Sequence, residues 1–216
     1  NIKSEFINGM RVTDANTMDV VEMVLGGSVN KEIVSSINRN GGKAIGVTGK
    51  DGQFIRAKKM TIDRYSPELG ASEIIDIGHV GQVKSIDTEV LSVILGSNFI
   101  PVIAPIGVDA QGATYNINAD LVASKLAGAL QAGRLIYLTD VDCILDGSGN
   151  LITSVDAATI KHMLDDQTIS GGMIPKIEYA LEALQSRVGK VQIINGTRRH
   201  ALLLELFTDE GIGTEV

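Results

Sequence analysis

Blocks of apolar residues at helical spacing alternate along the chain with short runs of consecutive apolar residues. The helical blocks predict one helix after Thr13-Asp14 that ends at Gly26-Gly27, and a second after Ser28 that ends at Gly41-Gly42. Three runs are almost entirely apolar and predict core strands. The run 99–106 predicts a central strand buried on both faces, and 135–138 and 191–194 predict two further buried strands.

Shorter elements fill the remaining sequence. An extended segment over 2–12 is broken at Asn8-Gly9, a dipeptide that favours a hairpin turn. Residues 60–78 include Pro67 and Gly70 and are predicted to form an irregular surface excursion. Further strands are expected over 43–47, 53–57, 80–86 and 213–216, and further helices over 88–95, 121–130, 154 or 156 to 163, 173–186 and 200–207.

The order of these elements favours one fold class. Strands that alternate with helices are typical of α/β proteins, in which a mostly parallel central sheet is sandwiched between helices. The first strongly apolar strand begins near residue 100, so we expect a soft boundary there between two lobes that share the sheet, 1–105 and 106–216.

Net charge and aromatic content exclude several classes of partner. The chain has 216 residues, and its 19 basic and 26 acidic side chains give a formal net charge of −7. This balance argues against binding to duplex nucleic acid or to anionic lipid. With no Trp and only 4% aromatic residues, the chain also lacks the stacking platforms that bind single strands.

The single cysteine and the hydropathy indicate a compartment. Cys143 has no second cysteine with which to form an internal disulfide or a cysteine-based zinc site, which fits a reducing cytosol. No apolar run approaches the roughly 20 residues of a spanning helix, and there is no signal-peptide pattern. The sequence therefore predicts a cytoplasmic protein with no membrane partner.

A polar cluster stands where a loop leads into a predicted helix, in the sequence Asn116-Ile117-Asn118-Ala119-Asp120. Asn and Asp are ordinary helix caps, but this cluster has more polar side chains than one cap requires. Open α/β sheets bind ligands beyond the ends of their strands. Capping alone and ligand binding both remain open for these residues.

A second motif, Gly171-Gly172-Met173-Ile174-Pro175-Lys176, begins a predicted helix. Glycines let a ligand approach the backbone, and the free amides of a first helical turn attract anions. Lys176 is unfavourable for the helix by itself because it meets the positive end of the helix dipole. A bound phosphate between the two removes this conflict, and a solvated lysine after a glycine-broken start is the alternative.

Three acidic residues, Asp140, Asp142 and Asp146, have the spacing of a calcium loop. The pattern fails because Ile144 stands at the fifth position, where a ligand is needed, and no glycine follows it. Turn and strand-end positions are the simpler explanation for Asp142 and Asp146. Asp140 ends a predicted strand, where a nucleotide or its ribose is expected to lie.

The basic and imidazole side chains carry weaker signals. Arg11 follows the Asn8-Gly9 turn as a lone basic residue, suited either to a surface salt bridge or to clamping an anion. His79, His162 and His200 are dispersed, and no Ser-His-Asp or Cys-His arrangement can be argued from their positions.

Taken together, these motifs resemble the N-acetylglutamate kinase family. The resemblance implies the amino-acid kinase fold, with residues 1–105 on the N-acetylglutamate-binding and dimer side and 106–216 as the nucleotide-binding lobe. It also implies phosphorylation of the γ-carboxylate of N-acetyl-L-glutamate in arginine biosynthesis, with ATP and with Mg²⁺ that ATP carries. The residues that carry it are 8–14, 29–32, 41–44, 48–52, 116–120, 139–141 and 171–176.

The resemblance implies a role for each motif. Arg11 is expected to bind the α-carboxylate of N-acetylglutamate, and Asn116 and Asn118 to contact the same substrate. Asp120 is expected to orient catalytic lysines, and Lys176 to stabilise charge on the transferring phosphoryl group. Because the acceptor carboxylate is already ionised at neutral pH, no general base is needed. Positioning and positive charge are the remaining tasks.

The resemblance extends to a nucleotide site and an effector site. The C-terminal stretch 200–214 resembles the arginine-inhibited branch of the family, and a short amphipathic helix followed by a turn is the simpler alternative. The residues expected to line ATP are Asp140, Val141, Asp142, Cys143, Ile144, Leu145, Thr168, Ile169, Ser170, Gly172 and Met173. Those expected to bind arginine are His200, Glu205, Gly211 and Gly213.

The sequence departs from the family pattern at its beginning. Family members begin with a strand that ends in a lysine-plus-glycines motif, which supplies the other catalytic lysine, and a second glycine-rich loop follows. Neither motif occurs in this sequence, so the chain as it stands is expected to be inactive. The N-terminal helix that joins the arginine-inhibited members of the family into hexamers is also missing from this sequence. For the oligomeric state, the resemblance implies either a homodimer or a hexamer.

Two other functions remain open. The first is another carboxylate or carbamate kinase of the same fold, such as aspartokinase. A panel of substrates would distinguish such a kinase from an N-acetylglutamate kinase. An arginine-sensing regulatory fragment without catalysis, with the nitrogen-signalling PII protein as its partner, is consistent with the missing lysine and glycine motifs.

Overall fold

The chain divides into two units, Asn1–Val122 and Ala123–Val216. The computed structural model describes residues 6–7, 10–66, 71–140, 144–146, 148–169, 171–208 and 211–216. Each unit has strands and helices of its own, and the division falls within one helix, α4 (Ala119–Ala129). The expected lobe boundary after residue 105 stays a prediction.

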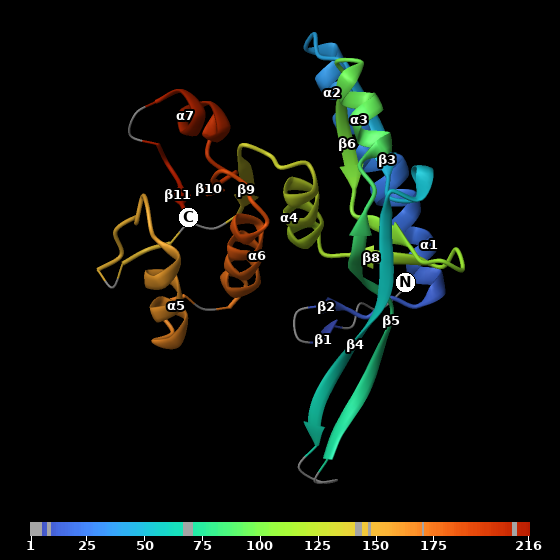
Figure 1. The fold of residues 1–216 in the computed structure, drawn as a ribbon, viewed down its shortest axis with the longest axis horizontal. Coiled ribbons are helices and arrows are strands. Elements are labelled where there is room, and N and C mark those ends of the chain that lie inside the picture. The colour runs from blue at the N-terminus through green and yellow to red at the C-terminus, as the bar shows by residue number, and fades with distance from the viewer. Residues whose placement is uncertain are drawn as a thin grey trace. The chain divides into compact units, whose positions relative to one another are not determined.

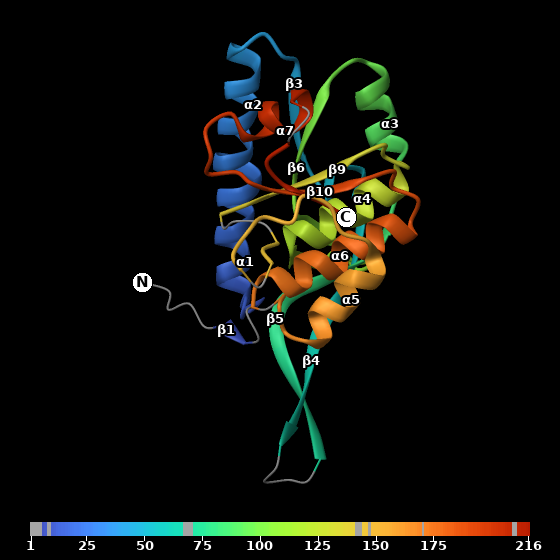
Figure 2. The same ribbon diagram turned by 90° about the vertical axis from the view of Figure 1, so that its left-hand side faces the viewer.

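A continuous helical rod opens the first unit and is drawn in blue in Figure 2. It consists of α1 (Ala15–Val21), the π-helical segment η1 (Glu22–Val29) and α2 (Asn30–Arg39). The predicted break at Gly26-Gly27 is wrong. A Cβ at Gly26 would lie 3.0 Å from Thr48 Cγ2, so this glycine lets the rod pack closely against a neighbouring strand and does not end it.

Both ends of the rod are capped where the sequence predicts. Before the rod, Asp14 Oδ1 accepts a hydrogen bond from the amide of Thr17 at 2.7 Å. After it, Gly41 has a φ of 87°, and the amide of Gly42 donates to the carbonyl oxygen of Ile37 at 3.0 Å. This is the Schellman closure that glycine favours, so the predicted stop at Gly41-Gly42 is confirmed.

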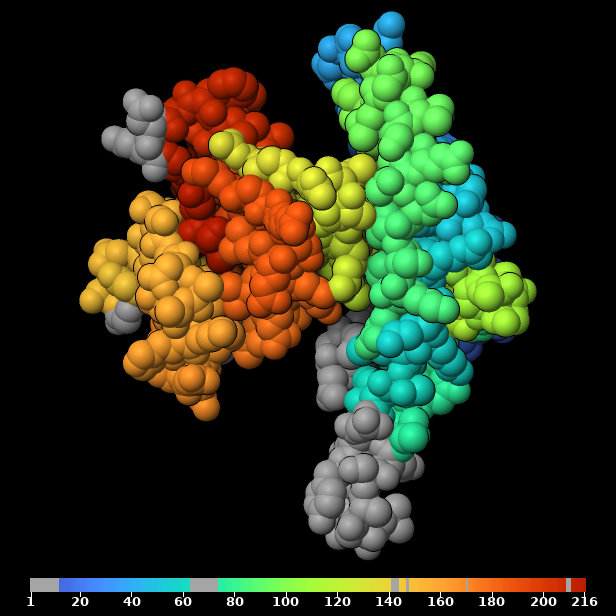
Figure 3. Space-filling model, viewed as in Figure 1, coloured from blue at the N-terminus to red at the C-terminus, as the bar shows by residue number. Residues whose placement is uncertain are grey.

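A parallel pair of strands packs against α2. It joins β3 (Ala44–Thr48) to β6 (Ile100–Ala104), with the helix α3 (Glu89–Gly96) before β6. The predicted strand 99–106 is divided between β6 and β7 (Ile106–Val108). Burial of β6 on both faces was predicted and is not observed, because Ile100 is exposed and Val102 and Ile103 are only half-buried. Val93, Phe99 and Ile100 are exposed in this segment, which is green in Figure 3.

A long antiparallel hairpin extends from the first unit and is coloured teal in Figure 1. It consists of β4 (Ile55–Ser66), after the short turn η2 (Asp51–Gln53), and β5 (Ala71–Ile86). The predicted irregular excursion over 60–78 is therefore wrong. Ile62 and Ile77 belong to a buried cluster, as the alternation of a strand requires. Pro67 and Gly70 lie outside the described residues, between Ser66, where β4 ends, and Ala71, where β5 begins.

Two short strands close a small barrel with this hairpin. Its order is β4-β5-β8-β7, where β8 (Thr114–Ile117) runs parallel to β5 and antiparallel to β7. Phe54, Ile55 and Ile106 are fully buried in this unit. The barrel brings together stretches of sequence that are far apart along the chain, and this matters for the candidate site.

A three-stranded sheet forms the centre of the second unit. Its order is β11 (Thr214–Glu215), β10 (Val191–Asn195) and β9 (Leu135–Thr139), and β9 and β10 are parallel. The predicted strands 135–138 and 191–194 are thus confirmed. Residues of α5 (Ala157–Asp165) and α6 (Met173–Gln185) pack with β9 and β10 in one buried apolar cluster. A short helix, α7 (Ala201–Phe207), contacts β10.

Parallel strand pairs and intervening helices occur in both units, which confirms the α/β class. Within the described part of the chain, no helix combines the length and the apolar character that crossing a bilayer requires.

Candidate functional site

The predicted site residues fall in both units. Arg11, Asn116, Asn118 and Asp120 belong to the first unit, whereas the nucleotide residues, Lys176 and the effector residues belong to the second. The two groups are therefore described separately.

Arg11 stands at the end of a small hairpin. The strands β1 (Phe6–Ile7) and β2 (Met10–Arg11) pair antiparallel, with Phe6 opposite Arg11. Their pairing agrees with a hairpin centred on Asn8-Gly9, and those two turn residues lie outside the described part of the chain.

The residues that follow Arg11 are fixed to β5 at Gly78. The amide of Thr13 donates to Ile77 O at 3.0 Å, and the amide of His79 donates to Thr13 O at 2.6 Å. Between these two bonds, Gly78 has a φ of 77°, and a Cβ there would lie 2.1 Å from Thr13 O. Only glycine fits at this position. The two hydrogen bonds fix the main chain at Thr13, two residues after Arg11.

Asn116 is held by the same stretch of β5, although it follows β5 in the sequence whereas Arg11 precedes it. In the barrel, Asn116 on β8 pairs with Val80 on β5 and with Ile106 on β7. Gly78 bridges Thr13 while Val80 pairs with Asn116, so two adjacent parts of β5 hold the backbones that carry Arg11 and Asn116. The structure thus anchors these two predicted substrate-binding segments to one strand.

Asn118 caps α4. Its Oδ1 accepts hydrogen bonds from the amides of Asp120 at 2.8 Å and Leu121 at 3.2 Å. The capping explanation therefore accounts for the oxygen of this side chain. Asp120 is half-buried in the first turn of the helix, and its role in orienting lysines stays a prediction.

Behind Asn116, an aspartate and a tyrosine fix the turn that leads into β8. Asp109 Oδ2 accepts from the hydroxyl of Tyr115 at 2.9 Å, and Asp109 Oδ1 accepts from the amides of Gln111 and Ala113, each at 2.9 Å. Burial acts to raise the pKa of Asp109, but these hydrogen bonds outweigh it and hold the pKa below its ordinary value. Burial, followed by donation to Asp109, raises the pKa of Tyr115.

In the second unit, two polar residues stand at one edge of the sheet. Asp140 follows β9, and Asn195 ends β10 opposite Thr139. Asn195 Oδ1 accepts from the amide of Thr197 at 3.0 Å and from its hydroxyl at 2.6 Å, which shapes the turn after the strand. The carboxyl ends of parallel strands are the usual ligand-binding edge of an open α/β sheet.

The glycines before α6 leave their surroundings open. Gly171 has a φ of 59°, and a Cβ at Gly171 or at Gly172 would meet no described atom within 4 Å. Lys176 is half-buried in the first helical turn, and its Nζ lies 5.6 Å from the centre of the Tyr137 ring on β9. A bound phosphate and a solvated lysine both remain open for Lys176.

The other predicted nucleotide residues have mixed environments. Ile144 and Ile169 are buried, whereas Asp140, Leu145, Thr168 and Gly172 are exposed and Met173 is half-buried. The amide of Thr168 donates to Asp166 Oδ1 at 2.9 Å, which fixes the turn before the glycines. Val141, Asp142, Cys143 and Ser170 lie outside the described residues.

Glu205 on α7 is only 9% exposed, and its carboxylate holds the loop before β11. Its Oε2 accepts from the amides of Ile212 at 2.8 Å and Gly213 at 3.0 Å, and its Oε1 accepts from Gln192 Nε2 at 2.6 Å. Gly211 is also adjacent, because a Cβ there would lie 3.2 Å from Glu205 Oε2. Three of the predicted effector residues, Glu205, Gly211 and Gly213, are therefore neighbours.

Two features surround this carboxylate. Gln192 is 5% exposed, and its Oε1 has no hydrogen-bond donor within the described chain. His200 precedes α7 with a left-handed φ of 59°, and its Nε2 lies 3.2 Å from Arg199 Nε. A buried acceptor without a donor is unfavourable for the folded state.

Sequence patterns alone did not single out Gly78 as a site residue, and they treated His79 only as one of three dispersed histidines. An isolated glycine inside an alternating apolar pattern signals a bulge or a close backbone approach. In this sequence Pro67 and Gly70 outweigh that signal, because they predict an irregular stretch over 60–78. For metal ions, no group of three or more His, Cys, Asp or Glu side chains is placed to bind one among the residues that the structure describes.

Comparisons with known proteins agree on one family. The model of the amino acid kinase family matches residues 1–195. An acetylglutamate kinase from Saccharophagus degradans is 60% identical over 214 residues, which cover 99% of this chain and 71% of that protein. An acetylglutamate kinase from Syntrophobacter fumaroxidans is 57% identical over 214 residues, or 99% of this chain and 72% of that protein.

A solved structure has a similar fold. It is an N-acetylglutamate synthase from Neisseria gonorrhoeae, complexed with coenzyme A and N-acetyl-glutamate, and it is 26% identical with a TM-score of 0.82. The match covers 99% of this chain and 46% of that one, so this chain spans less than half of the synthase.

Proposed function

The chain belongs to the acetylglutamate kinases of the amino acid kinase family, and we propose that it phosphorylates the γ-carboxylate of N-acetyl-L-glutamate. In this reaction a γ-carboxylate oxygen forms a bond to the terminal phosphorus of ATP, and the bond from that phosphorus to the bridging oxygen of ADP breaks. The product is N-acetyl-L-glutamyl 5-phosphate, an intermediate of arginine biosynthesis. We place this reaction in the cytoplasm.

The observation that carries the proposal is the pair of anchors on β5. Thr13 is bonded around Gly78, and Asn116 pairs with Val80, so the Arg11 and Asn116 segments share one rigid support. An arginine and an asparagine suit an N-acyl amino acid, because the guanidinium binds a carboxylate in two-pronged fashion and the amide bonds to carboxylate or acetamido groups. We assign Arg11 to the α-carboxylate and Asn116, with the amide nitrogen of Asn118, to the same substrate.

The phosphoryl side of the reaction is assigned to the second unit. The open glycine turn and the amides at the start of α6 fit the phosphates of ATP, and Lys176 adds a positive charge there. ATP supplies the phosphoryl group and arrives with Mg²⁺. Lys176 stabilises the negative charge that develops on the transferring group. Asp120, in the first unit, is proposed to orient catalytic lysines. The acceptor is ionised already, so no residue needs to remove a proton.

The nucleotide itself is assigned to the carboxyl edge of β9 and β10 and to the turn before α6. Asp140 and the turn at Asn195 stand at this edge, which is the usual binding position in such sheets. Exposed Thr168 and half-buried Met173 are able to contact a ligand, whereas buried Ile144 and Ile169 support the surrounding backbone.

Substitution of Arg11 tests the substrate assignment. In the product of the complete coding sequence, Arg11→Ala is expected to raise the KM for N-acetylglutamate about tenfold to a hundredfold, the loss typical of a charged hydrogen bond. The contact touches a carboxylate that does not react, so kcat and the KM for ATP should change little. Arg11→Lys keeps the charge without the two-pronged geometry and should be intermediate.

A substrate panel separates the proposal from its alternatives. Turnover of N-acetylglutamate but not of aspartate, glutamate or carbamate supports the assignment. Preferred turnover of aspartate or carbamate indicates another kinase of the same fold. Arginine binding by a complete protein that turns over none of the four supports the regulatory alternative, for which the PII protein is the candidate partner.

Feedback by arginine is a second proposal, favoured by the environment of Glu205. A carboxylate suits a guanidinium, and Gln192 Nε2 holds this carboxylate in place by donating to Glu205 Oε1 at 2.6 Å. Gln192→Leu should therefore weaken arginine binding in calorimetry and leave turnover unchanged, with exposed Gln185→Leu as the control. Arginine and N-acetylglutamate should weaken each other's binding by the same factor.

For the oligomeric state, a homodimer or a hexamer is proposed for the complete protein.

A further inference from the structure

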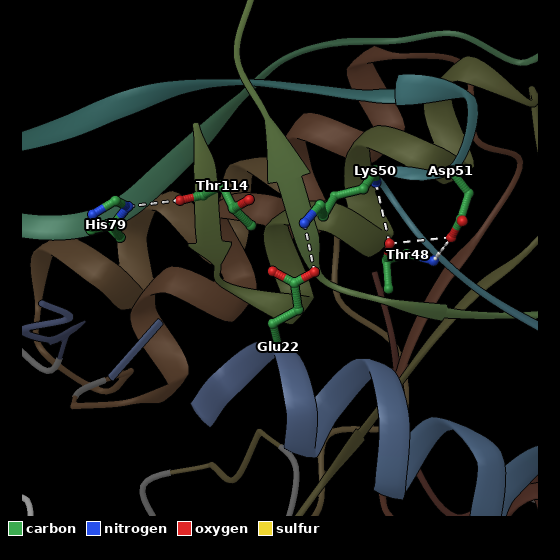
Figure 4. Close-up of polar contacts among 6 residues, drawn as sticks. All are labelled: Glu22, Thr48, Lys50, Asp51, His79 and Thr114. Carbon is green, nitrogen blue, oxygen red and sulfur yellow. Dashed lines mark hydrogen bonds and ion pairs between the residues drawn. The ribbon is translucent and has the colours of Figure 1, made fainter. Parts of the chain in front are cut away.

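His79 lies where the two anchored segments of the first unit meet. It follows Gly78 on β5, and its main-chain amide donates to Thr13 O at 2.6 Å. Its ring Nδ1 lies 2.9 Å from Thr114 O on β8, a contact drawn in Figure 4. The imidazole is half-buried, and its centre is 6.1 Å from the centre of the Tyr115 ring, at an interplanar angle of 37°.

The partner of Nδ1 fixes the chemical form of this contact. Thr114 O is a carbonyl oxygen and can only accept, so Nδ1 must carry the hydrogen and donate it. The other ring nitrogen is not needed for the bond. A side chain that places an N–H at the position of Nδ1 is therefore a sufficient replacement.

His79 adds a side-chain support to β8, which is also paired with β5 and β7. The hydroxyl of Tyr115 donates to Asp109, and the imidazole of His79 donates to Thr114 O. Asn116 is two residues beyond Thr114 on the same strand. Through its backbone, His79 also holds Thr13, two residues beyond Arg11. One residue therefore connects the two segments assigned to N-acetylglutamate.

We propose that His79 is a positioning residue for the acceptor substrate, setting β8 and Asn116 against the Arg11 segment through its Nδ1 hydrogen bond to Thr114. This inference rests on the proposed function. The side chain acts through its neighbours and has no part in phosphoryl transfer. Its loss should therefore change binding of the acceptor in ground and transition states alike.

Three substitutions test the position of the N–H group. His79→Asn places an amide nitrogen close to the position of Nδ1, whereas His79→Gln places it one methylene further out, and His79→Leu removes it. We expect the His79→Leu and His79→Gln variants to raise the KM for N-acetylglutamate about threefold to tenfold, the range for loss of one hydrogen bond. Asn should stay within about twofold of the wild type, and kcat and the KM for ATP should not change in any variant.

The outcomes are separable. Equal KM values for the Asn and Gln variants, or an unchanged KM in both Gln and Leu, overturn the inference, and so does a fall in kcat with an unchanged KM. The polar Asn and Gln variants decide the question even if the Leu variant does not fold. His162→Leu, at an exposed histidine of the second unit, is the matched control and should behave as wild type. Failure of the wild type to bind N-acetylglutamate in calorimetry contradicts the proposed function instead.

Discussion

In the first unit, Arg11 and Asn116 lie on segments held by non-local backbone pairing, whereas Lys176 in the second unit stands at the end of a local element. Arg11 and Asn116 are more than a hundred positions apart in the sequence, and both segments depend on contacts with β5 near Gly78 and Val80. Lys176 instead stands in the first turn of α6, directly after the glycines that open it. A site of the first kind depends on distant residues, whereas one of the second kind depends on a few neighbours.

The same difference is seen in two glycines with left-handed backbones. At Gly78 a Cβ would lie 2.1 Å from the carbonyl oxygen of Thr13, so the space is filled by the protein itself. At Gly171 a Cβ would meet no described atom within 4 Å. One glycine allows two segments of the chain to approach, and the other leaves room that suits a ligand. The two glycines therefore differ in their surroundings, which are protein at Gly78 and open space at Gly171.

The largest expected effect is that of removing Lys176, the residue of the second unit that is proposed to contact the transferring phosphoryl group. Lys176→Ala should lower kcat by about 10²–10³, because a positive charge directed at the transferring phosphoryl group acts mainly in the transition state. Lys50→Ala is the matched control in the first unit. Lys50 forms an exposed ion pair with Glu22, shown in Figure 4, and such pairs contribute little. Steady-state kinetics with both substrates measures the effect, and near-normal turnover in Lys176→Ala contradicts its assignment.

The next effect tests the two glycines directly. A left-handed φ costs a non-glycine residue about 1–2 kcal/mol, and both Gly78→Ala and Gly171→Ala incur it. Only Gly78→Ala adds a clash with Thr13 O, so its free energy of unfolding in urea should fall further. It should also raise the KM for N-acetylglutamate, whereas Gly171→Ala should act on the KM for ATP. Equal losses of stability, or exchanged effects on the two KM values, remove the distinction between the glycines.

Residues whose roles depend on neighbours in sequence were predicted well, and those that depend on distant contacts were not. The Schellman stop at Gly41-Gly42 and the glycine turn before α6 were found because glycine has local backbone preferences. Gly26 has the same composition signal, yet it continues a helix because Thr48 packs against it. Nothing local distinguishes the two cases.

The hairpin of β4 and β5 shows the same limit. Pro67 and Gly70 are breaker residues, and they led to the prediction of an irregular stretch over 60–78. Met60 and Ile62 alternate on β4, as Ile75 and Ile77 do on β5, and they form one apolar cluster only once the two strands are paired. The support that His79 gives to β8 was missed for the same reason, because Thr114 is a distant residue in sequence. Asn118 was found as a cap because its partners are the next residues.

The smallest expected effect compares two helix caps, one in each unit. Asp14 caps the rod in the first unit, where hydrogen bonds from the hydroxyl and then the amide of Thr17 lower its pKa below 3.8. Asp156 caps α5, where the amide of Thr159, then its hydroxyl, and the amide of Ala158 lower the pKa. A carboxyl group with a depressed folded pKa contributes stability above its unfolded pKa. That contribution is lost as the pH falls through the folded value.

Substitution by asparagine isolates this contribution, because an amide oxygen still caps the helix but does not titrate. Near neutral pH, Asp14→Asn and Asp156→Asn should each lower stability slightly, since each loses a negative charge at the positive end of a helix. This difference from the wild type should shrink as the pH falls below about 4. Hydrogen exchange of the amides in α1 and α5, measured at pH 6 and pH 3, assigns each loss to its own unit. A difference that does not change with pH contradicts the role of the carboxylate charge. If the α1 amides respond to Asp156→Asn, or those of α5 to Asp14→Asn, the two units do not unfold independently, and the comparison between them then applies to local geometry alone.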